Sequence, residues 1–205
     1  MNSRDVILAR LREAQPEPRP LPEVPLFDTA LPPALPAFRQ ALERLGGRWC
    51  EAPEAGSPGS SGKLDDWLKA RFPEARVICS AVPEIQGNRR AERVYWPRSL
   101  DDVDVGVVRA AFAVAETGSV WLSEREYHVN ALGYLSQHLV VLLDPDDIVG
   151  NLHQAYHRRE FFQASYAVLM SGPSATADIE GVLVRGAQGV RSLTVLALPR
   201  RPEAA

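Results

Sequence analysis

The fold class follows from residues 139–146, which read LVVLLDPD. Five apolar residues in a row, Leu139 to Leu143, are typical of a β-strand that is covered on both faces, as in a parallel sheet. The turn residues Asp144-Pro145-Asp146 come next, and we expect a helix to follow them and to run to about Glu160. A buried strand that leads into a helix is the repeating unit of an α/β protein.

Outward from this run, strand-like apolar segments alternate with segments of helical spacing. The other expected strands are residues 48–51, residues 76–80, three runs within residues 101–122, residues 166–170 and residues 192–198. Helices are expected at residues 38–45, which Gly46-Gly47 follows, at about residues 64–72, and from residue 174 to about residue 185. This alternation predicts an α/β fold with a largely parallel sheet flanked by helices.

The beginning of the chain differs from the rest in composition. Val6, Leu8 and Leu11 have the spacing of a short amphipathic helix, and a proline-rich arm follows at residues 16–36. Proline fixes φ and cannot donate a backbone hydrogen bond, so the arm should be extended and irregular. We therefore divide the chain into a helix with its arm, residues 1–36, and an α/β domain, residues 37–205. The helix can dock on its own domain or on another subunit, and the sequence leaves both open.

Composition and charge argue against several classes of protein. The formal net charge is −3 and the arginines are scattered, which argues against a nucleic-acid-binding face. The chain has no run of about 18 or more apolar residues, so we expect no membrane span. Residues 1–14 lack the apolar core of a secretory signal, and a cytoplasmic location is therefore expected.

Metal and cluster ligands are also few. Cys50 and Cys79 cannot by themselves supply the four thiolates of an iron–sulfur cluster, and we expect free thiols. His153 and His157 are four apart on an expected helix, but the sequence offers no further ligands near them. We therefore predict no metal site in this chain.

The first segment that can carry chemistry is Glu116-Thr117-Gly118-Ser119, between two apolar runs. Gly118 permits a tight turn, and Thr117 and Ser119 bring hydroxyl groups and backbone donors to its tip. Glu116 directly follows an apolar run, so partial desolvation would raise its pKa and suit it as a catalytic acid or base. The alternative is an ordinary hairpin turn with a solvated carboxylate.

The second segment, residues 171–180, reads SGPSATADIE and is expected to lead from a strand into a helix. Junctions at the carboxyl edge of a parallel sheet are common ligand sites, and free amides at a helix start favour an anion. The candidate ligand-binding residues here are Ser171, Gly172, Ser174, Thr176, Asp178 and Glu180. The alternative is helix capping by the hydroxyl groups, with the two acids stabilising the helix dipole.

Together the two segments predict one anion-binding pocket. Thr117, Gly118 and Ser119 would form one wall beside Glu116, and residues 171–176 would form the other. His128, in the polar stretch after an expected strand, is a candidate to cover this pocket, and a surface role is the alternative.

The same segments resemble the signatures of a known family. Residues 112–119, FAVAETGS, are similar to its strand that ends in an E-T-G-[ST] turn, and residues 171–180 are similar to its S-G-P-S-x-T-A-D-I-E signature. Their order, their separation and the intervening strand with its Asp-Pro turn agree as well. The likeness covers roughly residues 101–198, and on these residues the chain resembles the lactate-utilisation protein C family, which has a LUD domain.

This resemblance implies a fold similar to that of ribose-5-phosphate isomerase, glucosamine-6-phosphate deaminase and CoA transferases. It implies an accessory subunit without a cluster of its own, which acts with A- and B-type iron–sulfur partner proteins in oxidising L-lactate to pyruvate. A different hypothesis is a stand-alone isomerase-like or CoA-transferase-like enzyme that acts on a small anionic metabolite, with Glu116 as base or nucleophile. A third is a structural adaptor whose pocket no longer binds. Fold likeness does not choose between these, because function depends on the site.

Overall fold

A six-stranded parallel sheet forms the centre of the structure, a computed structural model that describes residues 2–53, 61–178 and 180–200. Its strands are β1 (Arg48–Glu51), β12 (Ser192–Ala197), β7 (His138–Leu143), β4 (Val105–Arg109), β2 (Ile78–Ser80) and β3 (Arg89–Arg90), in that spatial order. Each neighbouring pair is parallel. The prediction of a largely parallel α/β sheet is confirmed.

Strand β7 lies in the middle of this sheet, and both of its faces are covered. Leu139, Val141 and Leu143 belong to one buried cluster, whereas Val140 and Leu142 belong to another on the opposite face. The continuous apolar run is therefore explained by burial on both sides, because successive side chains of a strand point to opposite faces.

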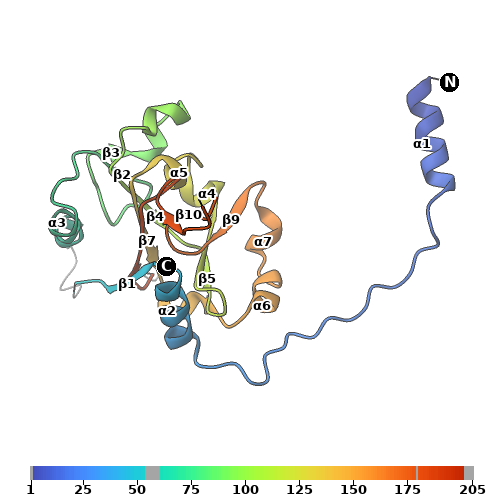
Figure 1. The fold of residues 1–205 in the computed structure, drawn as a ribbon, viewed down its shortest axis with the longest axis horizontal. Coiled ribbons are helices and arrows are strands. Elements are labelled where there is room, and N and C mark those ends of the chain that lie inside the picture. The colour runs from blue at the N-terminus through green and yellow to red at the C-terminus, as the bar shows by residue number, and fades with distance from the viewer. Residues whose placement is uncertain (1, 54–60, 179, 201–205) are drawn as a thin grey trace, which may run out of the picture.

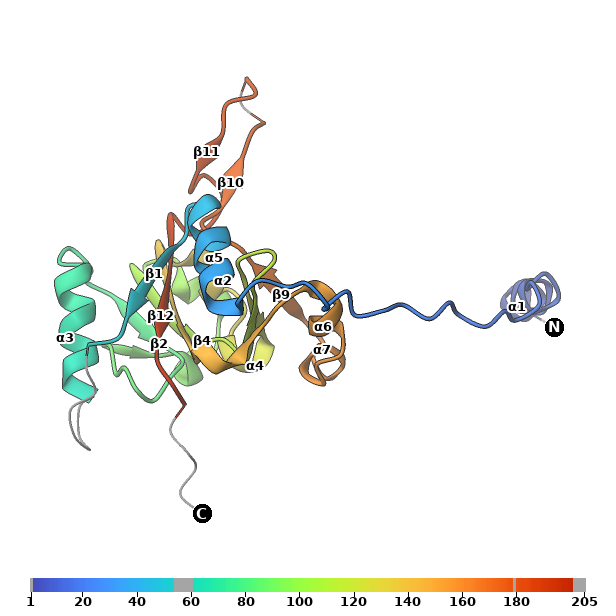
Figure 2. The same ribbon diagram turned by 90° about the horizontal axis from the view of Figure 1, so that it is seen from below.

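A second sheet packs on one side of the central sheet. It contains β8 (Ile148–Val149), β5 (Phe112–Val114), β6 (Ser119–Ser123) and β9 (Ala167–Met170), in that order. Helix α2 (Ala34–Arg44) contributes Phe38 and Leu42 to the cluster between the two sheets. Helix α3 (Ser61–Arg71) covers the other face of the central sheet with Leu64 and Leu68. The layers can be followed in Figures 1 and 2.

Short helices connect the strands around this core. They are α4 (Glu124–Tyr127), α5 (Leu132–Leu135), α6 (Leu152–Tyr156), α7 (Glu160–Gln163) and the 3-10 turns at Ala91–Arg93, Pro97–Leu100 and Pro145–Asp147. The single helix expected from Asp144 to about Glu160 is wrong. In its place the chain forms a 3-10 turn, strand β8 and then α6 and α7, since residues 148–149 pair with β5.

The helix expected from residue 174 to about residue 185 is also wrong. Strand β10 (Ala175–Thr176) pairs antiparallel with β11 (Val184–Arg185), and this two-stranded hairpin projects from the body in Figure 2. Backbone bonds explain the difference. Ser174 donates its N–H to the Val190 carbonyl at 3.0 Å and accepts from the Gly186 N–H at 2.7 Å, so its backbone is paired across the hairpin base.

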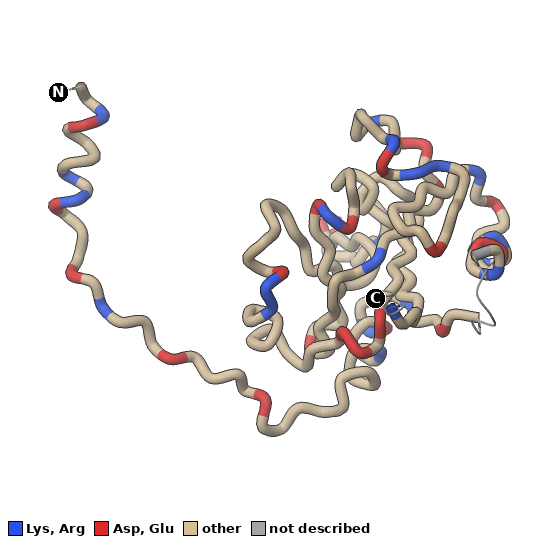
Figure 3. The backbone as a smooth tube through the Cα atoms, turned by 180° about the vertical axis from the view of Figure 1, so that it is seen from behind, with Lys and Arg blue, Asp and Glu red and all other residues tan. Residues whose placement is uncertain are grey.

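The N-terminal helix α1 (Ser3–Glu13) contains no buried residue and lies away from the body, as Figure 1 shows. The arm after it is extended, as predicted, but it ends earlier than expected, because α2 begins at Ala34. Along the arm, Arg19 is the single basic residue among three acids (Figure 3). Its far end contacts the body, because Asn151 donates to the carbonyl oxygens of Leu26 and Phe27 at 2.7 and 3.2 Å. Among the described residues, no helix has the length and apolar character to cross a bilayer.

Candidate functional site

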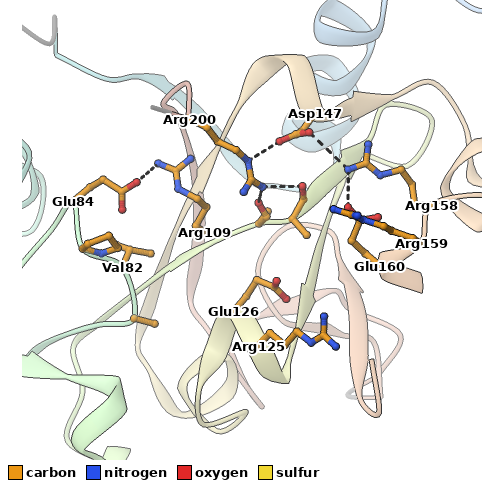
Figure 4. A pocket seen from close by; sticks show the side chains of 14 residues that line it. Val82, Glu84, Arg109, Arg125, Glu126, Asp147, Arg158, Arg159, Glu160 and Arg200 are labelled. Atoms are coloured by element: carbon orange, nitrogen blue, oxygen red, sulfur yellow. Dashed lines mark hydrogen bonds and ion pairs between the residues drawn. The ribbon is translucent and has the colours of Figure 1, made fainter. Parts of the chain in front are cut away.

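A charged pocket lies where the carboxyl ends of the central strands meet, and we call it the carboxyl-edge pocket. Its volume is about 610 Å³, within the range of ligand sites in proteins. It is lined by Ala81, Val82, Pro83, Glu84, Arg109, Ala110, Ala111, Arg125, Glu126, Asp147, Arg158, Arg159, Glu160 and Arg200, which Figure 4 draws as sticks. These residues lie at or after the ends of β2, β4, β7 and β12, in α4, or in and just before α7. This edge is where α/β sheets bind ligands.

One side of the pocket is built on an arginine at the end of a buried strand. Arg109 is the last residue of β4, and its guanidinium donates to Glu84 Oε1 at 2.7 Å and to the Leu198 carbonyl at 2.9 Å. Both side chains are largely covered, with exposed fractions of 15% for Arg109 and 24% for Glu84. The second carboxylate oxygen of Glu84 is buried and has no hydrogen-bond partner among the described residues. Glu84 therefore keeps an unused acceptor beside the pocket.

The opposite side is a chain of charges centred on Asp147. Arg200 Nε donates to Asp147 Oδ2 at 2.8 Å, and Arg158 Nη2 lies 3.7 Å from Asp147 Oδ1. Arg200 also donates to the carbonyl oxygens of Ala110 and Ala111, which fixes it across the end of β4. Figure 4 shows these side chains directed toward one another.

Arg158 has further contacts that hold its guanidinium in place. It donates to Glu160 Oε1 at 3.0 Å and lies over the ring of Phe112 at 5.1 Å from the centroid. Its Nε is buried and has no acceptor within the described part of the chain. A buried donor without a partner is costly unless a ligand or water satisfies it, so this atom favours an acceptor in the pocket.

Five arginines and four carboxylates line the pocket, which leaves one net positive charge. Burial opposes ionisation of Glu160, but a backbone hydrogen bond and the charge of Arg158 outweigh it and hold the pKa of this carboxyl below its usual value. Glu126 is occupied otherwise, since its Oε2 accepts from the backbone N–H and the hydroxyl of Ser123 at 2.7 and 2.6 Å. Arg159 has no ion-pair partner among residues 2–53, 61–178 and 180–200. The balance favours an anionic ligand.

The two segments predicted to meet in space do lie side by side, although neither lines the carboxyl-edge pocket. Residues 116–119 lead from β5 into β6, and β6 pairs antiparallel with β9, so that Val120 lies opposite Met170. Residues 171–174 therefore leave the sheet next to the 116–119 turn.

Helix α2 and Leu45, the residue that follows it, pack against the two segments. A Cβ added to Gly118 would lie 2.3 Å from the Leu42 nitrogen, and one added to Gly172 would lie 2.5 Å from the Leu45 carbonyl oxygen. Both glycines have positive φ, +61° and +70°. Close backbone packing thus accounts for the two glycines.

The polar side chains of the 116–119 turn have local partners. Glu116 is exposed, and its Oε2 accepts from the Leu152 N–H at 3.0 Å, at the start of α6. The exposure differs from the desolvation that we expected. The hydroxyls of Thr117 and Ser119 are bonded to each other at 2.5 Å. The catalytic role of Glu116 and the ligand-binding roles of the turn stay predictions.

The remaining predicted residues are distributed over the hairpin and the surface. Ser171 and Ser174 are half-buried, and the Thr176 hydroxyl accepts from the Asp178 N–H at 3.3 Å. Asp178 and Glu180 are exposed in the hairpin, so the alternative in which they stabilise a helix dipole is wrong, and their ligand-binding role stays a prediction. Ile179 lies outside the described residues.

The histidines do not assemble into a site. His128 follows α4 with its imidazole exposed, and its Nε2 lies 3.8 Å from Glu92 Oε1. His153 packs against the ring of Phe27. No group of three or more His, Cys, Asp or Glu side chains in the described ranges is arranged to hold a metal ion.

Sequence reasoning missed the residues of the carboxyl-edge pocket. A signal was present for Arg109 and Arg200, because each comes at or just after the end of an apolar strand, and strand ends carry ligand sites in this fold class. No comparable signal marks Asp147 or Arg158. Both lie in the segment that we expected to be one helix, and their meeting depends on the turns that replace it.

Comparisons with known proteins agree with this architecture. A crystal structure of a DUF162 family protein from Deinococcus radiodurans is similar, with a TM-score of 0.55 and 18% identity over 80% of this chain and 95% of that one. The lactate utilization protein C of Bacillus pumilus is 32% identical over 116 residues, and an uncharacterized protein of Neisseria meningitidis serogroup B is 29% identical over 100 residues. These alignments cover 53% and 47% of this chain, and they span just under half of the relatives' own lengths, 48% and 43%.

A family model for the LUD domain matches residues 48–198, from the first strand of the central sheet to just beyond the last. The matched region contains both sheets and every residue of the carboxyl-edge pocket except Arg200. The chain belongs to the LUD domain family.

Proposed function

We propose that this chain is a cluster-free accessory subunit of a system that oxidises L-lactate to pyruvate, and that its carboxyl-edge pocket binds a small carboxylate. Membership of the LUD domain family and the similarity to the lactate utilization protein C of Bacillus pumilus support the pathway. The observation that carries the ligand class is the arginine-lined pocket at the carboxyl edge of the sheet.

The pocket offers the groups that a hydroxy acid needs. A carboxylate is bound best by guanidinium donors, and Arg158 Nε is a buried donor with no acceptor in the described structure. A hydroxyl group needs an acceptor, and Glu84 Oε2 is a buried acceptor with no donor there. Arg159 adds a positive charge and forms no ion pair among the described residues. Lactate and pyruvate share the carboxylate, so we expect the pocket to bind either.

In this proposal, partner proteins accept the electrons that the oxidation of lactate releases. Conversion of L-lactate to pyruvate releases two electrons and two protons, and the two cysteines of this chain, Cys50 and Cys79, are too few for a four-cysteine cluster. In this proposal the A- and B-type iron–sulfur proteins accept the electrons. The contribution of this chain is to bind and orient the acid anion.

Reconstitution tests the proposal. The partner iron–sulfur proteins are assayed for lactate-dependent dye reduction with and without this chain, and the chain is deleted in a bacterium that has no other lactate oxidase. We expect dye reduction to require the chain and the deletion strain to fail on L-lactate as sole carbon source. Normal growth of that strain would refute the assignment to this pathway.

A further inference from the structure

A second pocket lies at the opposite edge of the central sheet, where the parallel strands begin. Its volume is about 540 Å³, and we call it the amino-edge pocket. Arg48, His138 and Ser192 are the first residues of β1, β7 and β12, and Arg191 directly precedes β12. Arg71, at the end of α3, completes the set of basic residues that line it.

Three arginines and two carboxylates line this pocket, which leaves one net positive charge, and the arginines form no ion pairs among the described residues. Arg48, Arg71 and Arg191 come from three different elements. The two carboxylates are Asp104 and Glu74. Asp104 Oδ2 already accepts from the backbone N–H groups of residues 76 and 77, at 2.7 and 2.9 Å. The arginines of the carboxyl-edge pocket, by contrast, are mostly paired.

Besides the arginines, the imidazole of His138 and the hydroxyl of Ser192 offer hydrogen-bonding groups in this pocket. His138 Nδ1 lies 2.8 Å from Ser192 Oγ, and the ring of Phe72 packs against the imidazole at 5.0 Å between centroids. Burial, followed by the charges of Arg191, Arg71 and Arg48, lowers the pKa of His138, while the charge of Asp104 acts in the opposite direction. The charges of the three guanidinium groups that line the pocket therefore all act on the His138 imidazole.

We propose that the amino-edge pocket binds a phosphate group through Arg48, Arg71 and Arg191. Guanidinium groups bind phosphate oxygens in a bidentate manner, and three of them around one cavity match an anion with several oxygens and a double charge better than they match one carboxylate. The cavity is larger than a phosphate ion needs, so it has room for the organic part of a phosphate ester. The site lies at the other edge of the sheet and does not depend on lactate oxidation.

Histidine NMR gives a direct test on the intact chain. The four histidines are titrated with and without inorganic phosphate at matched ionic strength, and His138→Gln assigns the signal. We expect bound phosphate to raise the pKa of His138, because its negative charge offsets the three arginines. His128, His153 and His157 lie outside the pocket and serve as internal controls. An unchanged titration of His138 in tens of millimolar phosphate would overturn the proposal.

Variants and other anions then identify the contacts and the ligand class. Arg71→Gln and Arg191→Gln should each weaken phosphate binding by about tenfold, whereas Arg44→Gln, on the exposed part of α2, should leave it unchanged. The assigned contacts would be contradicted if Arg71→Gln and Arg191→Gln bound phosphate as tightly as the wild type does. The ligand class would be contradicted if acetate bound as tightly as phosphate. Tighter binding of glycerol 3-phosphate would indicate an ester as the ligand, and weaker binding would indicate free phosphate.

Discussion

Two regions of this molecule carry the features of a functional site, and they are stabilised in different ways. The first, which we call the motif surface, comprises residues 116–119 and 171–174. Its glycines pack against helix α2, and its hydroxyls are partly bonded to each other. The second is the carboxyl-edge pocket, where arginines and carboxylates from separate parts of the chain form a network of ion pairs.

The residues by which the family can be recognised in the sequence are therefore different from the residues that offer groups for binding an anion. Each of the two segments of the motif surface is a short continuous stretch of sequence that contains turn residues whose backbone geometry glycine permits, so it is easily recognised. The carboxyl-edge pocket is assembled from single residues at the ends of several strands, and it has the unsatisfied donor and acceptor. We infer that a family signature can mark a packing requirement while the ligand chemistry lies elsewhere.

The largest expected effect tests packing at the motif surface. Gly118→Ala should lower the free energy of unfolding by about 3 kcal/mol or more, because the new Cβ meets backbone atoms of α2 at a positive φ. Gly181→Ala is the matched control. Its φ is also positive, +71°, but nothing lies within 4 Å of the added Cβ, so we expect a loss of only about 1 kcal/mol. Urea denaturation measures the free energy of unfolding of both variants. An equal decrease in the two would contradict the packing role of Gly118.

The second effect tests the ion pairs of the carboxyl-edge pocket. Arg109→Met leaves Glu84 largely buried without its partner, and we expect a loss of about 2 kcal/mol in the free energy of unfolding. Adding Glu84→Gln to this variant should recover part of the loss, because the uncompensated charge is removed. Arg159→Met, which breaks no described ion pair, should change stability by less than about 0.5 kcal/mol. Urea denaturation measures these changes as well. An Arg109→Met protein with the same free energy of unfolding as the wild type would refute a stabilising role for the Arg109–Glu84 ion pair.

The third effect compares the two regions by activity. In the reconstituted dye-reduction assay, Arg158→Gln and Arg159→Gln should each lower kcat/KM for L-lactate by about tenfold, because a guanidinium contact to the carboxylate is lost. The combined variant Thr117→Ala/Ser174→Ala tests the ligand-binding role that the sequence predicts for the motif surface. A greater loss in that variant than in the arginine variants would place the binding site at the motif surface instead. Thermal melts of each variant separate loss of fold from loss of binding.

The smallest effect is a pH dependence within the pocket. Burial opposes ionisation of Glu160, but a backbone hydrogen bond and the charge of Arg158 keep its pKa below the ordinary glutamate value of 4.5. The folded pKa is the lower one, so the ionised group stabilises the fold above pH 4.5, and this contribution is lost as the pH falls through the folded pKa.

Carboxylate NMR checks this dependence. Arg158→Gln should raise the pKa of Glu160 toward its ordinary value and reduce the acid sensitivity of folding. Glu124 is the control, because hydrogen bonds from the backbone amides of Ser165 and Tyr166 lower its pKa, and Arg158 is not among the causes. An unchanged Glu160 titration in Arg158→Gln would contradict the proposed coupling.

The sequence by itself determined the fold class and the family signature. The apolar run Leu139–Leu143 indicated a strand buried on both faces, and its alternate residues do lie in two clusters. The proline-rich arm was also predictable, because proline restricts φ and removes a donor wherever it occurs. These features depend on local chemistry, which a sequence displays directly.

Only the tertiary structure decided how the segments after residues 144 and 174 fold and where the charged pocket lies. Residues 148–149 pair with β5, and the backbone of Ser174 pairs across a hairpin base, so strand pairing replaces the expected helix in both places. Likewise, Arg109 and Arg158 line one pocket although nearly fifty positions separate them. A sequence pattern records spacing along the chain, whereas an ion-pair network depends on distances across it, and the packing of the two sheets sets those distances.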